Sequence, residues 1–227
     1  KNPTDQEKER FITMWGQIAE YFQNYHPSQL LFEPLNEPQD KLTPGEWNDL
    51  LVKALVKIRE TNPDRGVLIG TADWGGVGAL NDLKWPTGDP NLILTIHYYE
   101  PFNLTHQGQA WMGDDALPAG ITWNDTKSER EAVDKHFAQI EDYRNNHGNM
   151  PVHIGEYGAF YPGDIDSRVL WATYISNRAK DSGYSSAYWD FHFYLDNNGV
   201  FAQSIKDAIF TNKVPEKPAE LFMVETN

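Results

Sequence analysis

The nine residues Asn91–Tyr99 read NLILTIHYY, a run that is apolar almost throughout. A continuous apolar run, without the alternation of a half-exposed strand, is typical of a strand buried on both faces of a parallel sheet. Val67–Gly70 (VLIG) and Val152–Gly155 (VHIG) have the same character on either side of it. Two shorter segments, Leu30–Phe32 and Ser186–Trp189, complete a set of about five predicted strands.

Helical patterns alternate with these strands. Three of them open with a capping box, in which a Ser or Thr is followed three residues later by Glu. These boxes are Thr4–Glu7, Thr43–Glu46 and Ser128–Glu131. Two further helices are expected over Ser167–Lys180 and Ile205–Phe210. Strands that alternate with amphipathic helices predict an α/β fold, with a parallel sheet covered by helices. We expect one domain over residues 1–227, in which the tail 213–227 lies over exposed surface.

Composition excludes several classes of function. The formal charge of −14 argues against nucleic acid, whose phosphates require clustered Lys and Arg. With no cysteine, the chain has neither disulfides nor thiolate sites. Its seven histidines show no metal-ligand spacing, so neither a metal nor another cofactor is expected. No apolar run approaches the roughly 18 residues of a membrane span, and the first residues do not resemble a signal peptide.

The unusual polar and aromatic residues fall where the predicted strands end. In parallel α/β folds, function is located in the loops at the carboxyl ends of the strands. The residues at these positions are Asn36, Glu37, Trp74, His97, Tyr99, Glu156 and Trp189.

Two of these residues, Glu37 and Glu156, suit the cleavage of a glycosidic bond. That reaction needs one carboxylic acid to protonate the leaving oxygen and one carboxylate to meet the anomeric carbon. Partial burial at a strand end raises a carboxyl pKa, which helps one site to hold both an acid and a nucleophile. Asn36 can hydrogen-bond a sugar 2-hydroxyl, and either Tyr99 or Tyr157 can donate to the nucleophile.

Each residue also has a structural explanation when taken alone. Glu37 fits an acid at a helix N-terminus, and Glu156 fits a buried acid paired with an arginine. His97 and Trp189 fit an ordinary core. Independent structural roles do not account for their joint placement at strand ends, which favours a functional site.

Four segments resemble glycoside hydrolase family 5, the cellulases and their relatives. Leu31–Pro38 (LFEPLNEP) resembles the Asn-Glu-Pro signature that ends the fourth strand of the family's barrel. The other three, which follow in the family's order, are His97–Phe102 with Thr105–Gly108, Ile154–Gly158 and Tyr188–Phe191.

The resemblance implies a (β/α)8 barrel and a retaining double displacement. Glu37 would be the acid/base and Glu156 the nucleophile, with carboxyl groups about 5 Å apart. Asn36, His97, Tyr99 and Trp189 would surround the sugar at the −1 subsite. On position alone, Trp74 and Trp111 would be platforms for outer sugars.

The first helix resembles the family's third, so we expect a truncated barrel with the equivalents of strands four to eight. An Arg and a His that normally line the −1 subsite have no counterpart here. Five strands leave two open edges, and open edges invite pairing with another chain. We therefore expect a homo-oligomer or a swapped arrangement.

The expected activity is hydrolysis of β-1,4-glucan, with mannanase, xylanase or β-glucosidase activity as alternatives within the family. A different class, an inactive or weak carbohydrate-binding fragment, remains open. A sugar-phosphate enzyme is disfavoured, since the chain has no Gly-rich phosphate loop. The partner is an oligosaccharide or β-glucan, with no nucleic acid or membrane, and the family implies a secreted or extracellular location.

Overall fold

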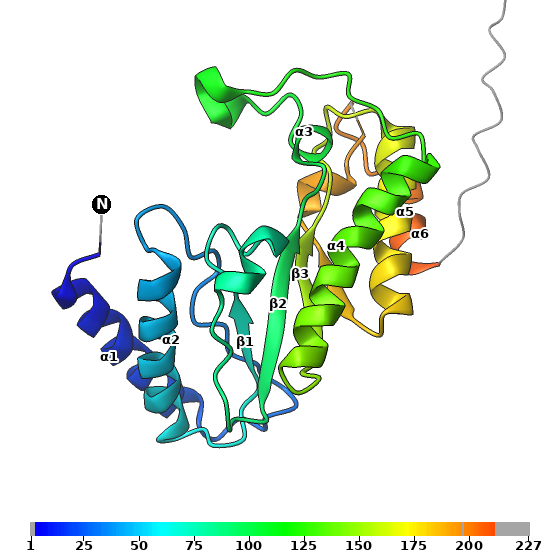
Figure 1. Cartoon of the computed structure of the whole chain (residues 1–227). Coiled ribbons are helices and arrows are strands. Elements are labelled where there is room, and N and C mark those ends of the chain that lie inside the picture. Colours follow the sequence, from blue (N-terminus) through cyan, green and yellow to red (C-terminus); the bar gives the residue numbers. More distant parts are fainter. Residues whose placement is uncertain (1–2, 197, 212–227) are drawn as a thin grey trace, which may run out of the picture. The chain divides into compact units, whose positions relative to one another are not determined.

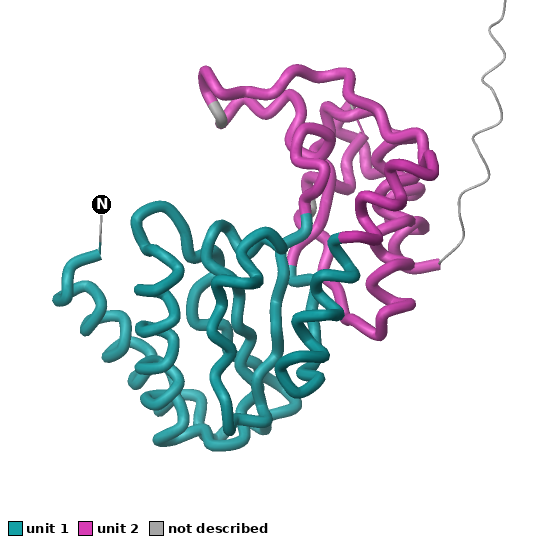
Figure 2. Tube along the Cα trace, viewed as in Figure 1, with its two compact units in different colours: residues 1–98, 136–155 teal, residues 99–135, 156–227 magenta. Residues whose placement is uncertain are grey.

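A computed structural model describes residues 3–196 and 198–211 of the chain. The predicted tail 213–227 lies outside these described residues. Contacts divide the chain into two compact units, which Figure 2 shows in teal and magenta. Unit 1 comprises residues 1–98 and 136–155, and unit 2 comprises residues 99–135 and 156–227.

Helices and strands alternate along the described residues as the sequence predicts (Figure 1). The α-helices are α1 (Asp5–Phe22), α2 (Pro44–Arg59), α3 (Phe102–Thr105), α4 (Lys127–Asn146), α5 (Ile165–Asp181) and α6 (Gln203–Phe210). The strands are β1 (Val67–Gly70), β2 (Leu92–Tyr98), β3 (Val152–Tyr157) and β4 (Ser185–Tyr188). Three short 3-10 helices complete the set, η1 (Val77–Asp82), η2 (Ala110–Asp115) and η3 (Phe191–Tyr194).

Within the described residues, the sheet has four strands in the order β1-β2-β3-β4, and β3 passes from unit 1 into unit 2. In unit 1, β1 pairs in parallel with β2, which places Val67 opposite Leu92 and Gly70 opposite Thr95. The first of the five predicted strands along the chain, Leu30–Phe32, is reduced to a single parallel bridge between Phe32 and Val67. Pro34 has no N–H for a ladder, which explains why regular pairing goes no further.

Two capped helices of unit 1 hold the ends of its strands. The capping boxes predicted at Thr4 and Thr43 are both present, at the starts of α1 and α2. The Trp15 indole of α1 donates to the Pro34 carbonyl at 3.0 Å. The Trp47 indole of α2 donates to the Gly70 carbonyl at 2.9 Å. Each helix is therefore fixed to the backbone at the carboxyl end of a strand.

Arg65 is a fully buried hub at the opposite end of unit 1. Its guanidinium donates to backbone carbonyls at and after the end of α1 and to the Asn62 amide oxygen, and it stacks over the Phe32 ring at 5.2 Å. The carbonyls belong to Phe22, Tyr25, His26 and Leu30. These bonds close the connection from α1 to the Phe32 bridge.

The predicted capping box of α4 was wrong by two residues. The Thr126 hydroxyl accepts from the Glu129 N–H, and the Glu129 carboxylate accepts from the Thr126 N–H at 2.7 Å. Ser128 therefore lies inside the first turn and does not cap the helix. The sequence Thr126–Glu131 (TKSERE) contains two overlapping boxes, and only the packed helix decides between them.

Unit 2 is organised by α5, which packs against α6 and β4. Asp164 caps α5 by accepting from the Ser167 N–H at 2.8 Å. Arg168 is fully buried in its first turns and donates to the carbonyls of Ala159, Phe193 and Leu195. Burial lowers the pKa of its guanidinium from the ordinary value. One buried side chain thus joins the segment after β3 to the segment after β4.

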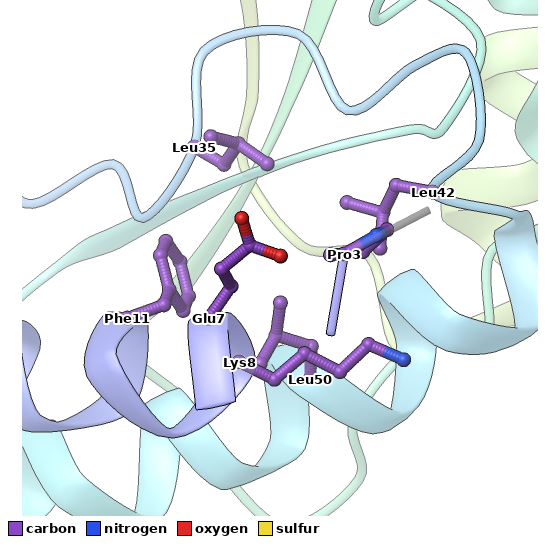
Figure 3. A pocket seen from close by; sticks show the side chains of 7 residues that line it. All are labelled: Pro3, Glu7, Lys8, Phe11, Leu35, Leu42 and Leu50. Carbon is purple, nitrogen blue, oxygen red and sulfur yellow. The ribbon is translucent and has the colours of Figure 1, made fainter. Parts of the chain in front are cut away.

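A shallow hollow of about 190 Å³ lies beside α1 and α2 in unit 1 (Figure 3). It is lined by Pro3, Glu7, Lys8, Phe11, Leu35, Leu42 and Leu50. None of the predicted site residues lines it. Among the described helices, none combines the length and apolar character needed to cross a membrane.

Replacing Arg65 with Met should lower the free energy of unfolding by about 3 kcal/mol or more, because it leaves buried carbonyls without donors. Urea denaturation followed by circular dichroism measures this loss. Arg10→Met, at an exposed position of α1, is the matched control and should cost little. Equal stability of the two variants would contradict the role of the hub.

Candidate active site

In unit 1, Glu37 lies in the loop that follows the Phe32 bridge. Its side chain is 22% exposed, whereas Asn36 beside it is exposed. The loop is held on one side by the bond from the Trp15 indole to the Pro34 carbonyl. Glu37 is therefore anchored by the local fold but still open to solvent and to a ligand.

His97, from the end of β2, is the hydrogen-bond partner of Glu37. Its Nδ1 lies 2.7 Å from Glu37 Oε1, and its side chain is only 4% exposed. One of the two atoms carries the shared proton. A buried imidazole held by its own strand restricts the rotamers of the carboxyl group that it contacts. The pair can thus hold and exchange a proton at a fixed position.

Trp74 lies in a tight turn after β1, also in unit 1. Its indole is 54% exposed, and its backbone N–H donates to the Pro38 carbonyl at 3.2 Å. This bond ties Trp74 to the residue that follows Glu37. A large exposed apolar ring, held by backbone bonds, suits the face of a sugar.

In unit 2, Glu156 is 9% exposed at the end of β3, and the Tyr99 hydroxyl donates to its Oε2 at 2.8 Å. A hydrogen bond to the charged form of a carboxyl group favours that form. Tyr157, the other candidate donor, lies beside Ser186, and burial raises the pKa of its hydroxyl well above the ordinary value. Of the two tyrosines, Tyr99 is the one whose hydroxyl donates a hydrogen bond to the Glu156 carboxylate.

Trp189 follows β4 in unit 2 and is 50% exposed, which argues against the core position that it would take as an ordinary structural residue. Its N–H donates to the Tyr157 carbonyl at 2.9 Å. A Cβ added at Gly158 would lie 1.9 Å from the Trp189 carbonyl oxygen. Only glycine at position 158 therefore permits this close approach of the two backbones.

Trp111 is the most exposed indole of the predicted set, at 63%. It packs edge to face on Phe160 with ring centroids 4.5 Å apart. The base of its loop is closed by Gln107, whose buried side-chain amide bonds the backbone of Leu104, Gly120 and Ile121. A long loop thus presents Trp111 on a fixed base.

His106 lies against Tyr99, although it is not among the site residues predicted from the sequence. Its ring meets the Tyr99 ring edge to face at 4.9 Å and stacks on Phe102 at 3.9 Å. Its Nδ1 lies 2.8 Å from the Thr105 hydroxyl. The signal that points to it is its place in the Thr105–Gly108 segment. Periodicity carries no such signal, because His106 follows the short helix α3.

The structure therefore places the predicted residues in two groups. Glu37, His97, Trp74 and Asn36 lie in unit 1, and Glu156, Tyr99, Trp189 and Trp111 lie in unit 2. β2 ends at Tyr98, so strand alternation does not fix the direction of Tyr99. One group offers a carboxyl with a proton-sharing imidazole, and the other offers a carboxylate held by a phenol. Exposed indoles occur in both.

Known proteins are similar to this chain over most of its length. The sequence profile described as Cellulase (glycosyl hydrolase family 5) matches residues 1–195. Endoglucanase H of Acetivibrio thermocellus is 36% identical over 205 residues, which is 90% of this chain and 20% of that protein. Endoglucanase B of Neocallimastix patriciarum is 28% identical over 208 residues, which is 85% of this chain and 41% of that protein.

Solved structures show the same similarity. Endoglucanase Cel5A of the hyperthermophile Thermotoga maritima superposes with a TM-score of 0.85 at 36% identity, over 92% of this chain and 68% of that one. The cellulose synthase subunit Z of Clostridioides difficile gives a TM-score of 0.82 at 31% identity, over 89% of this chain and 68% of that one. The chain thus spans about two thirds of these structures, and less than half of the curated relatives named above.

Proposed function

This chain belongs to the cellulase family, glycosyl hydrolase family 5, and on that premise we propose that it hydrolyses β-1,4-linked glucan with retention at the anomeric carbon. The resemblance seen in the four sequence segments is confirmed by the family match. The predicted fold class is also confirmed, as part of a (β/α)8 barrel with parallel strands and surrounding helices. The observation that carries the proposal is that both candidate carboxyl groups have the hydrogen-bond partners that their two roles need.

In the proposed reaction Glu156 is the nucleophile. Its carboxylate attacks the anomeric carbon while Glu37 gives a proton to the leaving oxygen, and a covalent glycosyl-enzyme forms. Glu37 then removes a proton from water, which attacks the same carbon and releases Glu156. This double displacement requires the two carboxyl groups to lie about 5 Å apart during the reaction.

The partners of each carboxyl group support this division of roles. The Tyr99 hydroxyl donates to Glu156, which favours the ionised form that a nucleophile needs. His97 shares a proton with Glu37, the group that must take up and release one in each cycle. The partners would therefore be poorly suited to the reverse assignment.

The exposed aromatic residues support an oligosaccharide as the substrate. Trp74, Trp111 and Trp189 each expose half or more of their surface, and flat indoles stack on pyranose rings. We assign Asn36, which is exposed beside Glu37, to a sugar hydroxyl. The Thermotoga maritima enzyme has been solved with cellobiose and with mannotriose. We therefore include β-1,4-mannan as a second substrate.

A carbohydrate-binding fragment without catalysis is the alternative function. It would need the indole platforms but neither of the two carboxyl groups nor their partners. The chain keeps Glu37 with His97 and Glu156 with Tyr99 in hydrogen-bond contact, and its named relatives are endoglucanases. These observations favour the enzyme.

The two carboxyl groups should respond differently to substitution by Gln. Glu156→Gln should reduce hydrolysis of every aryl β-cellobioside to background, because no covalent intermediate forms. Glu37→Gln should lower kcat/KM for phenyl β-cellobioside by roughly 10²–10⁴-fold, yet leave the dinitrophenyl glycoside much less affected, since that leaving group needs no proton. Glu131→Gln, at an exposed helix position, is the control. Full activity of Glu156→Gln would refute the assignment.

Tyr99→Phe should move the acidic limb of the kcat/KM profile to higher pH. Loss of the hydroxyl removes a hydrogen bond that favours the ionised Glu156 carboxyl, so protonation inactivates the variant at a higher pH. The rate on the plateau should fall by less than the rate at low pH. A profile that is scaled down uniformly, without a shift of the limb, would speak against this role for Tyr99.

Self-association and an extracellular location are further parts of the proposal. Among the described residues Phe32 pairs with one strand only, and Leu31 beside it is exposed, so this edge is open to a second copy. The proposed extracellular location follows from the proposed substrate, because an insoluble glucan is accessible only outside the cell. Light scattering should give a mass above that of one chain, and Leu31→Lys at the edge should lower it. A monomeric mass over a wide range of concentrations would exclude this association.

A further inference from the structure

The turn after β1, residues 71–76, has an unusual backbone. Asp73, Trp74 and Gly75 all have left-handed φ, at 66°, 61° and 70°. Two of the three carry a Cβ, and a left-handed backbone is unfavourable for such residues. The turn is closed by bonds from the Thr71 hydroxyl to the Gly76 carbonyl at 2.7 Å and from the Gly75 N–H to the Thr71 carbonyl at 3.2 Å. The surrounding structure thus maintains a conformation that the sequence does not favour.

This turn joins the two segments that carry the Glu37–His97 pair. The Trp74 N–H donates to the carbonyl of Pro38, the residue after Glu37, at 3.2 Å. The carbonyl of Gly75 accepts from the backbone N–H of His97 at 3.0 Å. Two adjacent residues of one turn therefore hold the backbones of both partners, which lie 60 positions apart in the sequence.

Gly75 also touches the His97 side chain. A Cβ at position 75 would lie 3.2 Å from His97 Cγ, closer than side chains normally pack, and 3.4 Å from His97 Cβ. At a second glycine, Gly155, an added Cβ would lie 2.3 Å from Thr95 Oγ1 and, at an ordinary contact distance of 3.4 Å, against His97 Cδ2. The imidazole is thus fitted against two positions without side chains. At Gly75 the left-handed φ and the close approach of the ring both favour glycine.

We propose that Gly75 is a positioning residue for the acid/base. Its backbone conformation and missing side chain set the His97 imidazole at hydrogen-bond distance from Glu37, and so orient the carboxyl group that protonates the leaving oxygen. Gly75 acts through His97 and does not itself contact the substrate. This inference rests on the proposed function, because it assigns a role within that reaction.

The first test is the dependence of Gly75→Ala on the leaving group. For phenyl β-cellobioside, kcat/KM should fall by roughly 10-fold, because the added Cβ displaces the imidazole by a few tenths of an ångström and a full ångström costs about 10²-fold. The dinitrophenyl glycoside needs no proton, so its kcat/KM should stay close to that of the wild type. A purely structural defect would lower both rates by the same factor, and that result would overturn the inference.

Two matched controls separate the contact from the backbone strain. Gly88 has a left-handed φ of 85° but no atom within 4 Å of an added Cβ, so Gly88→Ala carries strain alone. Gly78 has neither property, so Gly78→Ala carries neither defect. Both variants should keep the wild-type ratio of the two rates. The same change of ratio in Gly88→Ala would also overturn the inference.

A second readout does not depend on activity. The proton between His97 Nδ1 and Glu37 Oε1 should give a downfield imidazole signal in the proton NMR spectrum, absent in Glu37→Ala. The signal should shift or broaden in Gly75→Ala and stay unchanged in the two controls. An unchanged signal in Gly75→Ala overturns the inference. If the wild type hydrolyses neither substrate, the proposed function fails and the NMR arm still decides whether Gly75 positions the pair.

Thr71→Val keeps the test decisive if Gly75→Ala does not fold. It removes the hydroxyl bond to the Gly76 carbonyl with little change of volume and leaves Gly75 in place. The loosened turn should give the same dependence on the leaving group with a smaller loss. Thr71→Val with unchanged rates and an unchanged imidazole signal would overturn the inference.

Discussion

The hydrogen bond between His97 Nδ1 and Glu37 Oε1 is the interaction on which the arrangement of unit 1 depends. It joins the end of β2 to the loop that follows the Phe32 bridge, and the turn after β1 contacts the backbone of both. Three consecutive parts of the α/β pattern therefore meet at one buried imidazole. A polar side chain with so little solvent access is stabilising only when its partners are fixed, so the neighbouring turn and glycines have little freedom.

Unit 2 uses a comparable arrangement around its own carboxylate. Tyr99, two residues after His97 in the sequence, donates to Glu156, and His106 packs against the Tyr99 ring. Gly158 permits the close approach of the Trp189 backbone, as Gly75 permits that of the His97 ring. In both units a carboxyl group is held by one side chain from the region where β2 ends.

Away from these groups, each unit contains one buried arginine that bonds backbone carbonyls. Arg65 collects the carbonyls after α1, and Arg168 collects those that follow β3 and β4. The five donors of a guanidinium can satisfy several carbonyls in irregular backbone, where no ladder or helix does so. The loops that carry Glu37 and Trp189 follow such segments, so each hub supports a loop with a candidate site residue in its own unit.

The sequence alone determined most of the helices and strands of this protein and pointed to two candidate carboxyl groups. The Thr4 and Thr43 capping boxes, the apolar runs of β1 to β3 and the place of Glu37 and Glu156 at strand ends are local patterns, read within a few residues. Tertiary structure decided the rest. It selected Thr126 over Ser128 as the cap of α4, shortened the Phe32 strand to a bridge, brought Tyr99 rather than Tyr157 to Glu156, and gave His106 and Gly75 their neighbours. These choices depend on contacts between residues far apart in the chain, and neither periodicity nor propensity encodes such contacts.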